Sequence, residues 1–108
     1  MTPKCLVKVV SVATTEKVLY LTPYATSSIL TSIIVCNRGA TTSTFRISNN
    51  TTSDVTSTSD YLYYDISITG NDTFVAEFNL PLITNNEIRV YSDTNNLTFS
   101  VYGKEDKV

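Results

Sequence analysis

The sequence contains no histidine and no tryptophan, and its 108 residues include only three glycines, three prolines and two cysteines. Histidine is the commonest general base and the commonest neutral metal ligand, so the Ser-His-Asp arrangement of many hydrolases is excluded. Charged residues are also scarce at 17%, compared with about a quarter in ordinary globular domains. We therefore expect no enzymatic activity, no cofactor and no metal site.

The charges that are present give a formal net charge of -2. No basic field exists to attract phosphates, so we expect no nucleic-acid partner. No apolar run approaches the length that spans a bilayer, and the first residues do not form a charged and then apolar secretion signal. We therefore expect synthesis in the cytoplasm and no membrane partner.

The two cysteines, Cys5 and Cys36, can form a disulfide only if the first strand lies beside the central strand with suitable Cβ geometry. A reducing compartment favours the alternative, in which both are buried thiols that pack as small apolar residues. Both possibilities stay open at the level of the sequence.

The strongest structural signal is the segment from Ser28 to Ser48, which we interpret as a hairpin. Its apolar run Ile29–Cys36 is mostly β-branched, which predicts a central strand covered on both faces rather than a helix. Asn37–Ala40 supplies turn residues that accept left-handed dihedrals. This hairpin is the expected centre of the domain.

Apolar and polar residues alternate along several strands, which predicts the faces that they bury. We expect Phe45 and Ile47 to point inward and Arg46 outward. In the strand Asp60–Ile68, the residues predicted to point inward are Leu62, Tyr64, Ile66 and Ile68, and those predicted to point outward are Tyr61, Tyr63 and Asp65.

Eight strands at short spacing, with no helical period, predict one all-β domain over residues 1–108, an antiparallel two-sheet β-sandwich of jelly-roll or immunoglobulin-like type. The predicted strands are Lys4–Ala13, Lys17–Leu21, Ile29–Cys36, Thr44–Ser48, Asp60–Ile68, Thr73–Leu80, Glu87–Tyr91 and Leu97–Gly103. Ser92–Asn96 reads as a tight hairpin turn. The flanking predictions are an arm at Met1–Pro3, a mobile loop at Asn49–Ser59 and a polar tail at Lys104–Val108.

Two kinds of side chain are candidates for function. Carboxylates could approach each other across strands as Asp60 with Asp65, or as Glu77 with Glu87, and act as acid and base or hold calcium. Solvated charges on outer faces are the ordinary alternative, which we favour. Outward tyrosines could form a contact surface, pack across strands within one sheet, or stack on sugar rings, for which the missing tryptophan is a disadvantage.

Four motifs carry a resemblance to a known family: Ser32–Gly39, Tyr63–Asp65, Gly70–Phe74 and Asn96–Phe99. With these motifs, nearly the whole chain resembles small virion structural proteins of tailed bacteriophages. The segment Leu21–Thr26 departs from the family pattern, where a Pro-containing turn with glycine is expected.

The resemblance implies a β-sandwich that assembles on the virion and has no enzymatic activity. It implies a capsid decoration or cement protein at the capsid surface, with the major capsid protein or other virion proteins as partners. We expect a homo-oligomer, a dimer or a trimer, and Arg38, Tyr61 and Tyr63 as interface residues. The alternatives are a neck, tail or fibre-base component and, less favoured, a carbohydrate-binding adhesin domain.

The predicted core can be tested with one substitution and one control. Ile33→Asp places a carboxylate without a partner in the predicted interior, at a cost of several kcal/mol, so we expect it to abolish folding. Asp54→Ala, in the predicted surface loop, leaves the melting temperature unchanged. Circular-dichroism melts of the two variants check this, and an unaffected melt of Ile33→Asp contradicts it.

Overall fold

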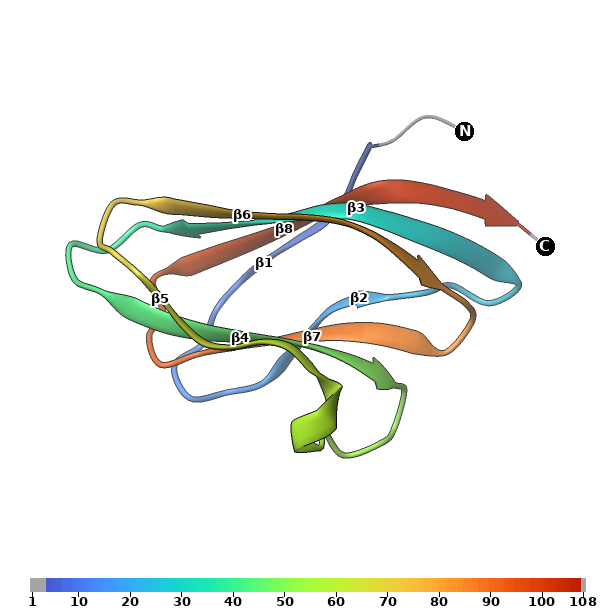
Figure 1. Ribbon diagram of the computed structural model, residues 1–108, viewed down its shortest axis with the longest axis horizontal. Coiled ribbons are helices and arrows are strands. Elements are labelled where there is room, and N and C mark those ends of the chain that lie inside the picture. Colours follow the sequence, from blue (N-terminus) through green and yellow to red (C-terminus); the bar gives the residue numbers. More distant parts are fainter. Residues whose placement is uncertain (1–3, 108) are drawn as a thin grey trace.

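Eight strands form two four-stranded antiparallel sheets that pack face to face in a computed structural model describing residues 4–107 (Figure 1). The strands are β1 (Lys4–Val10), β2 (Lys17–Leu21), β3 (Thr26–Asn37), β4 (Ser43–Thr51), β5 (Tyr61–Ile68), β6 (Thr73–Leu82), β7 (Asn86–Ser92) and β8 (Leu97–Lys107). A short 3-10 helix, η1 (Thr58–Asp60), precedes β5. Among these residues no helix has the length and apolar character needed to cross a membrane. The predicted arm Met1–Pro3 lies outside the described residues.

The strand order identifies the type of sandwich. The β3 sheet has the order β1-β8-β3-β6, and the β4 sheet has the order β2-β7-β4-β5. The chain crosses from one sheet to the other after almost every strand, and β4 and β5 are the only described consecutive strands that share a sheet. This order is that of a jelly roll, so the two-sheet β-sandwich is confirmed and the immunoglobulin-like alternative is not adopted.

The predicted hairpin from Ser28 to Ser48 is wrong, because β3 and β4 belong to different sheets. Asn37 is buried where the chain crosses between them, and its Nδ2 donates to the backbone oxygens of Thr41 and Ile68. The predicted hairpin at Ser92–Asn96 is wrong for the same reason, since β7 and β8 lie in opposite sheets. Turn residues mark where a chain reverses, but they do not specify the sheet to which the next strand is added.

The sequence predicted that the central strand β3 is covered on both faces, but the structure covers only one of them. Leu30, Ile33 and Val35 are fully buried between the sheets. Ile29, in contrast, is 42% exposed on the outer face, and Cys36 is only half-buried there. The apolar run, which only Thr31 and Ser32 interrupt, therefore reflects a one-sided strand whose outer face also carries apolar side chains.

The core lies between the two sheets, and the inward positions predicted for β4, β7 and β8 are confirmed. The fully buried side chains contributed by these strands are Phe45, Ile47, Ile88, Val90, Leu97, Phe99 and Val101. Phe45 from the β4 sheet packs against two rings of the β3 sheet, with its centroid 5.3 Å from that of Phe74 and 6.1 Å from that of Phe99. These aromatic contacts join the sheets across the interior.

The alternation predicted for β5 is confirmed at Tyr61, Asp65, Ile66 and Ile68 but wrong at Leu62, Tyr63 and Tyr64, because the strand contains irregularities that shift its register. Phe45 pairs with Ile66, but Ile47 pairs with Tyr63, so Tyr64 and Asp65 together oppose a single residue of β4. Such a β-bulge reverses which side chains face inward. Tyr63 packs on the core, whereas Leu62 and Tyr64 are 42% and 52% exposed.

The C-terminal prediction is also wrong, because β8 continues through Lys107 instead of ending in a polar tail at Lys104. Glu105 accepts a hydrogen bond of 2.5 Å from the hydroxyl of buried Tyr20, which ties the end of β8 to β2.

At the other end of the chain, β1 stops at Val10 and not at Ala13. β6 runs to Leu82 and not to Leu80, so it contains Pro81, which an edge strand tolerates.

Both cysteines are free thiols, so the possible disulfide is not formed. Cys36 is half-buried on β3, but Cys5 is exposed on β1, which contradicts its predicted burial. Their strands are separated by β8, and therefore the two side chains do not face each other as neighbours.

Tyr20 predicts a loss of stability in alkaline solution. Its burial and its hydrogen bond to Glu105 raise the pKa of the phenol from 10.0 to about 12. Between these pH values the unfolded state releases the Tyr20 proton and the folded state keeps it, so the free energy of unfolding falls as pH rises. We expect urea unfolding of Tyr20→Phe between pH 9 and about 12 to show a shallower decline than the wild type. Equal declines would exclude this contribution.

Candidate interaction surface

A cluster of aromatic and charged side chains lies on the outer face of the β4 sheet. We call it the Arg46 platform, and it consists of Arg46, Tyr61, Tyr64, Asp65 and Tyr91. The Arg46 guanidinium carbon lies 4.4 Å from the ring centroid of Tyr64, 4.8 Å from that of Tyr91 and 5.9 Å from that of Tyr61. These distances are in the range of cation–π attraction. The three rings therefore surround one cation.

The bulge in β5 builds the platform. It places Tyr64 and Asp65 opposite Arg46 on the same side of the sheet, and Asp65 adopts a left-handed conformation with φ 51°. A non-glycine residue in this region is strained, and such strain persists where the surroundings impose it. Here the Asp65 carboxylate accepts from Arg46 Nε at 2.6 Å and from Nη2 at 3.4 Å. The ion pair thus helps to hold the bulge.

The platform is ordered and electrically balanced. Its hydrogen bond to Asp65 raises the pKa of Arg46, which keeps the guanidinium charged. Tyr61 and Tyr64 pack edge to face, with their centroids 4.9 Å apart. Tyrosine and arginine are enriched among the residues that dominate binding energy at protein interfaces. The arrangement suits contact with another protein surface, because its side chains are already positioned before binding.

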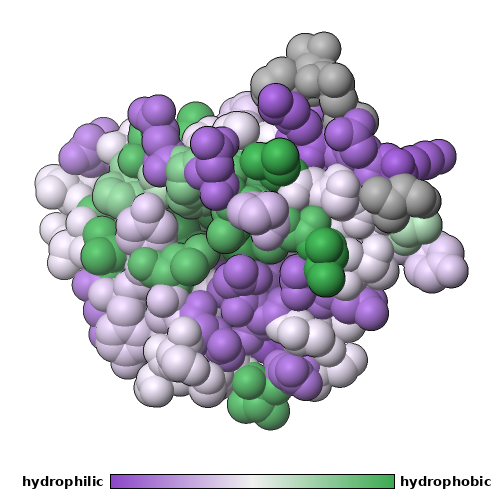
Figure 2. All heavy atoms as spheres, turned by 45° about the vertical axis from the view of Figure 1, so that its right-hand side comes forward, coloured by the Kyte–Doolittle hydropathy of each residue, from purple (hydrophilic) through white to green (hydrophobic). Residues whose placement is uncertain are grey.

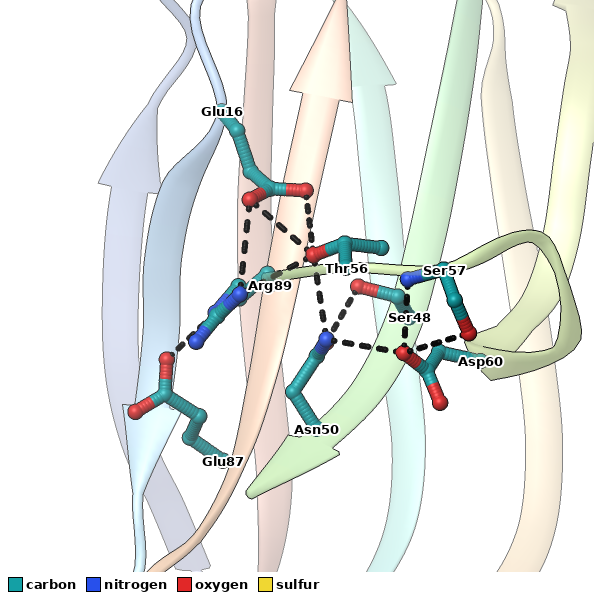
Figure 3. A network of polar contacts seen from close by, with 8 residues as sticks. All are labelled: Glu16, Ser48, Asn50, Thr56, Ser57, Asp60, Glu87 and Arg89. Carbon is teal, nitrogen blue, oxygen red and sulfur yellow. Dashed lines mark hydrogen bonds and ion pairs between the residues drawn. The ribbon is translucent and has the colours of Figure 1, made fainter. Parts of the chain in front are cut away.

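A buried polar network adjoins the platform on the same sheet (Figure 3). Arg89 and Glu87 point outward from β7, yet their side chains are only 10% and 4% exposed. Arg89 Nε donates to Glu87 at 2.6 Å, and Nη1 donates to Thr56 at 3.0 Å. Nη1 also lies 3.6 Å from Glu16, which precedes β2. The network therefore links three separate segments of the chain.

The network anchors the connection between β4 and β5. Asn50 donates to Thr56 at 3.0 Å and to Asp60 at 3.3 Å, while Asp60 also accepts from the backbone nitrogen of Ser57 at 2.8 Å. Residues 49–51 belong to β4 and residues 58–60 to η1, so the prediction of a loop throughout Asn49–Ser59 is wrong. In Figure 2 hydrophobic residues form a band across the middle of the surface, and hydrophilic residues lie both above this band and below it, toward this connection.

A polar hollow of about 460 Å³ opens beside this connection. Its lining is Asn49, Asn50, Thr51, Asp54, Val55, Ser57, Asp60 and Asn86. The carboxylate pairs considered as a possibility are not seen: Asp65 binds Arg46 while Asp60 binds Asn50 and Ser57, and Glu77 and Glu87 lie in opposite sheets. No group of three or more metal-binding side chains occurs within residues 4–107.

The three predicted interface residues lie in different places. Tyr61 belongs to the Arg46 platform. Tyr63 was expected to point outward, but it packs on the core, with its ring centroid 5.7 Å from that of Phe74. Arg38 follows β3 and donates to Thr98 and to the backbone oxygen of Asn95, both at 2.9 Å. The structure therefore gathers only Tyr61 into a cluster, and the interface role of all three stays a prediction.

Sequence reasoning missed Arg46, Tyr64, Asp65 and Tyr91 as a group. The density of tyrosines at the start of β5 is a visible signal, and the outward direction of Arg46 is confirmed. Strict alternation, however, assigned Tyr64 to the core, because a bulge leaves no clear mark in the residue types.

Comparison of the chain with models of protein families, with curated proteins and with solved structures gives no match.

The ion pairs Arg89–Glu87 and Arg46–Asp65 should differ in how much free energy of unfolding is lost when the acidic partner is removed. Glu87→Ala leaves Arg89 buried with only its weaker partners, so we expect a loss of roughly 3 kcal/mol in the free energy of unfolding. Asp65→Ala leaves Arg46 partly exposed to solvent and in contact with three tyrosine rings, so it should cost less than about 1 kcal/mol. Urea unfolding measures both variants. Equal losses would contradict the structural role assigned to the Glu87–Arg89 pair.

Proposed function

We propose that this protein is a non-enzymatic structural component of a bacteriophage virion that binds and stabilises the major capsid lattice from outside. The resemblance of its motifs to small virion proteins suggests the setting. The Arg46 platform is the observation that carries the proposal, since it offers a ready contact surface of tyrosine and arginine.

The distribution of charge supports a structural role. The two buried charged side chains of β7, Glu87 and Arg89, pair with each other and hold the connection between β4 and β5 in place. On the platform, Asp65 balances Arg46. A surface of this kind can approach a partner without the cost of burying an unpaired charge.

The size of the molecule also supports the proposal. The described chain measures 43 × 30 × 18 Å, and the shortest dimension runs across the strands, so both sheets are seen edge-on in Figure 1. A domain of this size bound to a symmetric lattice can repeat one modest contact at every equivalent position. Contacts that also link neighbouring subunits gain further strength from multivalency.

Copy number separates decoration from the alternative, a neck, tail or fibre-base component. We expect hundreds of copies in purified virions of the phage that encodes this protein, because every lattice position is equivalent. Quantitative mass spectrometry against the major capsid protein measures the ratio. About a dozen copies or fewer would exclude decoration and favour a position on a single symmetry axis.

Binding to capsids tests the platform itself. We expect the paired substitution Arg46→Ala and Tyr64→Ser to weaken binding to undecorated capsids by at least about tenfold, because it removes two central contact residues. Tyr24→Ser is the matched control, since Tyr24 is 90% exposed and lies outside the platform. Co-sedimentation with capsids measures both, and equal binding of the two variants would exclude the platform as the contact.

A further inference from the structure

The connection between β4 and β5, residues 52–60, covers charged side chains but has no apolar anchor of its own. None of its residues is buried, and Val55, its one apolar residue, is 90% exposed. Segments with few buried apolar contacts open locally at a lower free energy than the rest of a fold. The connection must therefore be held in place by its polar contacts.

Two side chains tie the connection to the rest of the molecule. Thr56 has contacts with Glu16, Asn50 and Arg89, and Asp60 accepts from Asn50 at 3.3 Å (Figure 3). Among the described residues, no other side chain of residues 52–60 has a hydrogen bond to a strand or to another connection. Thr56 thus makes most of these ties.

The Thr56 hydroxyl uses its whole hydrogen-bonding capacity in these contacts. It donates to the Glu16 carboxylate, with Oε2 at 2.9 Å, and it accepts from Asn50 Nδ2 and from Arg89 Nη1, both at 3.0 Å. A threonine hydroxyl has one donor and two acceptor positions, so all three are filled. One oxygen atom therefore joins the connection to β4, to β7 and to the segment before β2.

Loss of this hydroxyl would favour an open connection. In the closed state Arg89 Nη1 would keep only Glu16, at 3.6 Å, although the Arg89 side chain is only 10% exposed. A covered donor without an acceptor costs the free energy of removing it from water. Opening would let water reach this donor, and Glu87 would still neutralise the Arg89 charge.

Opening would also change the surface beside the Arg46 platform. Glu87 and Arg89 point outward from β7, on the face of the β4 sheet that carries the platform, and the closed connection covers them. Tyr61 of the platform begins β5 directly after the connection. The open state therefore presents an additional pair of opposite charges on this face.

We propose that the connection between β4 and β5 is a cover that opens and closes over the Glu87–Arg89 pair, and that the Thr56 hydroxyl is the contact that keeps it closed. Thr56 is thus a positioning residue, because it acts through Glu16, Asn50 and Arg89. The state of the cover sets which charges the face beside the platform presents. The inference is drawn from contacts within one chain and does not depend on the virion proposal.

Native-state hydrogen exchange of the full chain, followed by NMR, tests the opening. The amides of Thr52 and Asp54 report on the connection, since they donate to the backbone oxygens of Asn85 and Thr51. The amide of buried Val90 reports on unfolding of the sandwich. We expect the Thr52 and Asp54 amides to be at least about tenfold less protected than that of Val90, through an opening that low urea concentrations do not accelerate.

Substitutions then identify the contact that opening breaks. Thr56→Val should lower the protection of the Thr52 and Asp54 amides by at least about tenfold, and that of Val90 by the same factor, because only the closed state has the lost contacts. Thr56→Ser, which restores the hydroxyl, should match the wild type. Thr58→Val is the matched control, since the exposed Thr58 side chain has no hydrogen bond among the described residues.

A core substitution separates the cover from the sandwich. Val101→Ala, in the opposite sheet, removes buried methyl groups that the open and closed states share. It should lower the protection of the Val90 amide by at least about tenfold and leave that of Thr52 and Asp54 unchanged. Equal losses at all three amides would show that the connection opens only when the sandwich unfolds, which overturns the cover.

The remaining outcomes are equally decisive. Thr52 and Asp54 amides as protected as that of Val90 in the wild type exclude a separate opening. Unchanged protection of Thr52 and Asp54 in Thr56→Val, or a loss of the same size in Thr56→Ser or Thr58→Val, excludes the Thr56 hydroxyl as the contact. A Thr56→Val variant that does not fold also overturns the proposal, because an open cover leaves both sheets paired.

Discussion

The contact of Phe45 with Phe74 and Phe99 is the interaction on which the rest of the structure depends. It joins the two sheets across the interior, and it fixes which side of each strand is buried. Because side chains alternate along a strand, burying Phe45 directs Arg46 to the outer face. The site on that face is thus a consequence of the core, although no residue of the site is fully buried.

Sequence patterns predicted the strands well, because alternation of apolar side chains reflects one-sided burial directly. The inward positions of Phe45, Val90 and Phe99 follow from this pattern. The pairing of strands could not be read in the same way, since local turn residues at Asn37–Ala40 serve a crossing between sheets as well as a hairpin. Sheet membership depends on contacts between distant segments, which no local signal records.

The candidate site was only partly predictable for two physical reasons. An extra residue in β5 reversed the alternation, so Tyr63 and Tyr64 exchanged their expected sides. The second reason concerns Glu87 and Arg89, which point outward as their spacing suggests but are covered by the connection from β4. Whether a connection folds back over a sheet face depends on contacts between distant segments. The sequence around Glu87 and Arg89 therefore does not indicate that these side chains are buried.

The pairing of β1 with β8 has a consequence for biosynthesis. The first and last described strands are neighbours, and only β4 and β5 can pair through a local reversal of the chain. Folding must therefore close long loops early, which places such topologies among the slower folders, on a timescale of roughly milliseconds to seconds. A nascent chain still lacking β8 leaves β1 and β3 with unpaired edges, so the domain completes its fold only after the ribosome has synthesised its final strand.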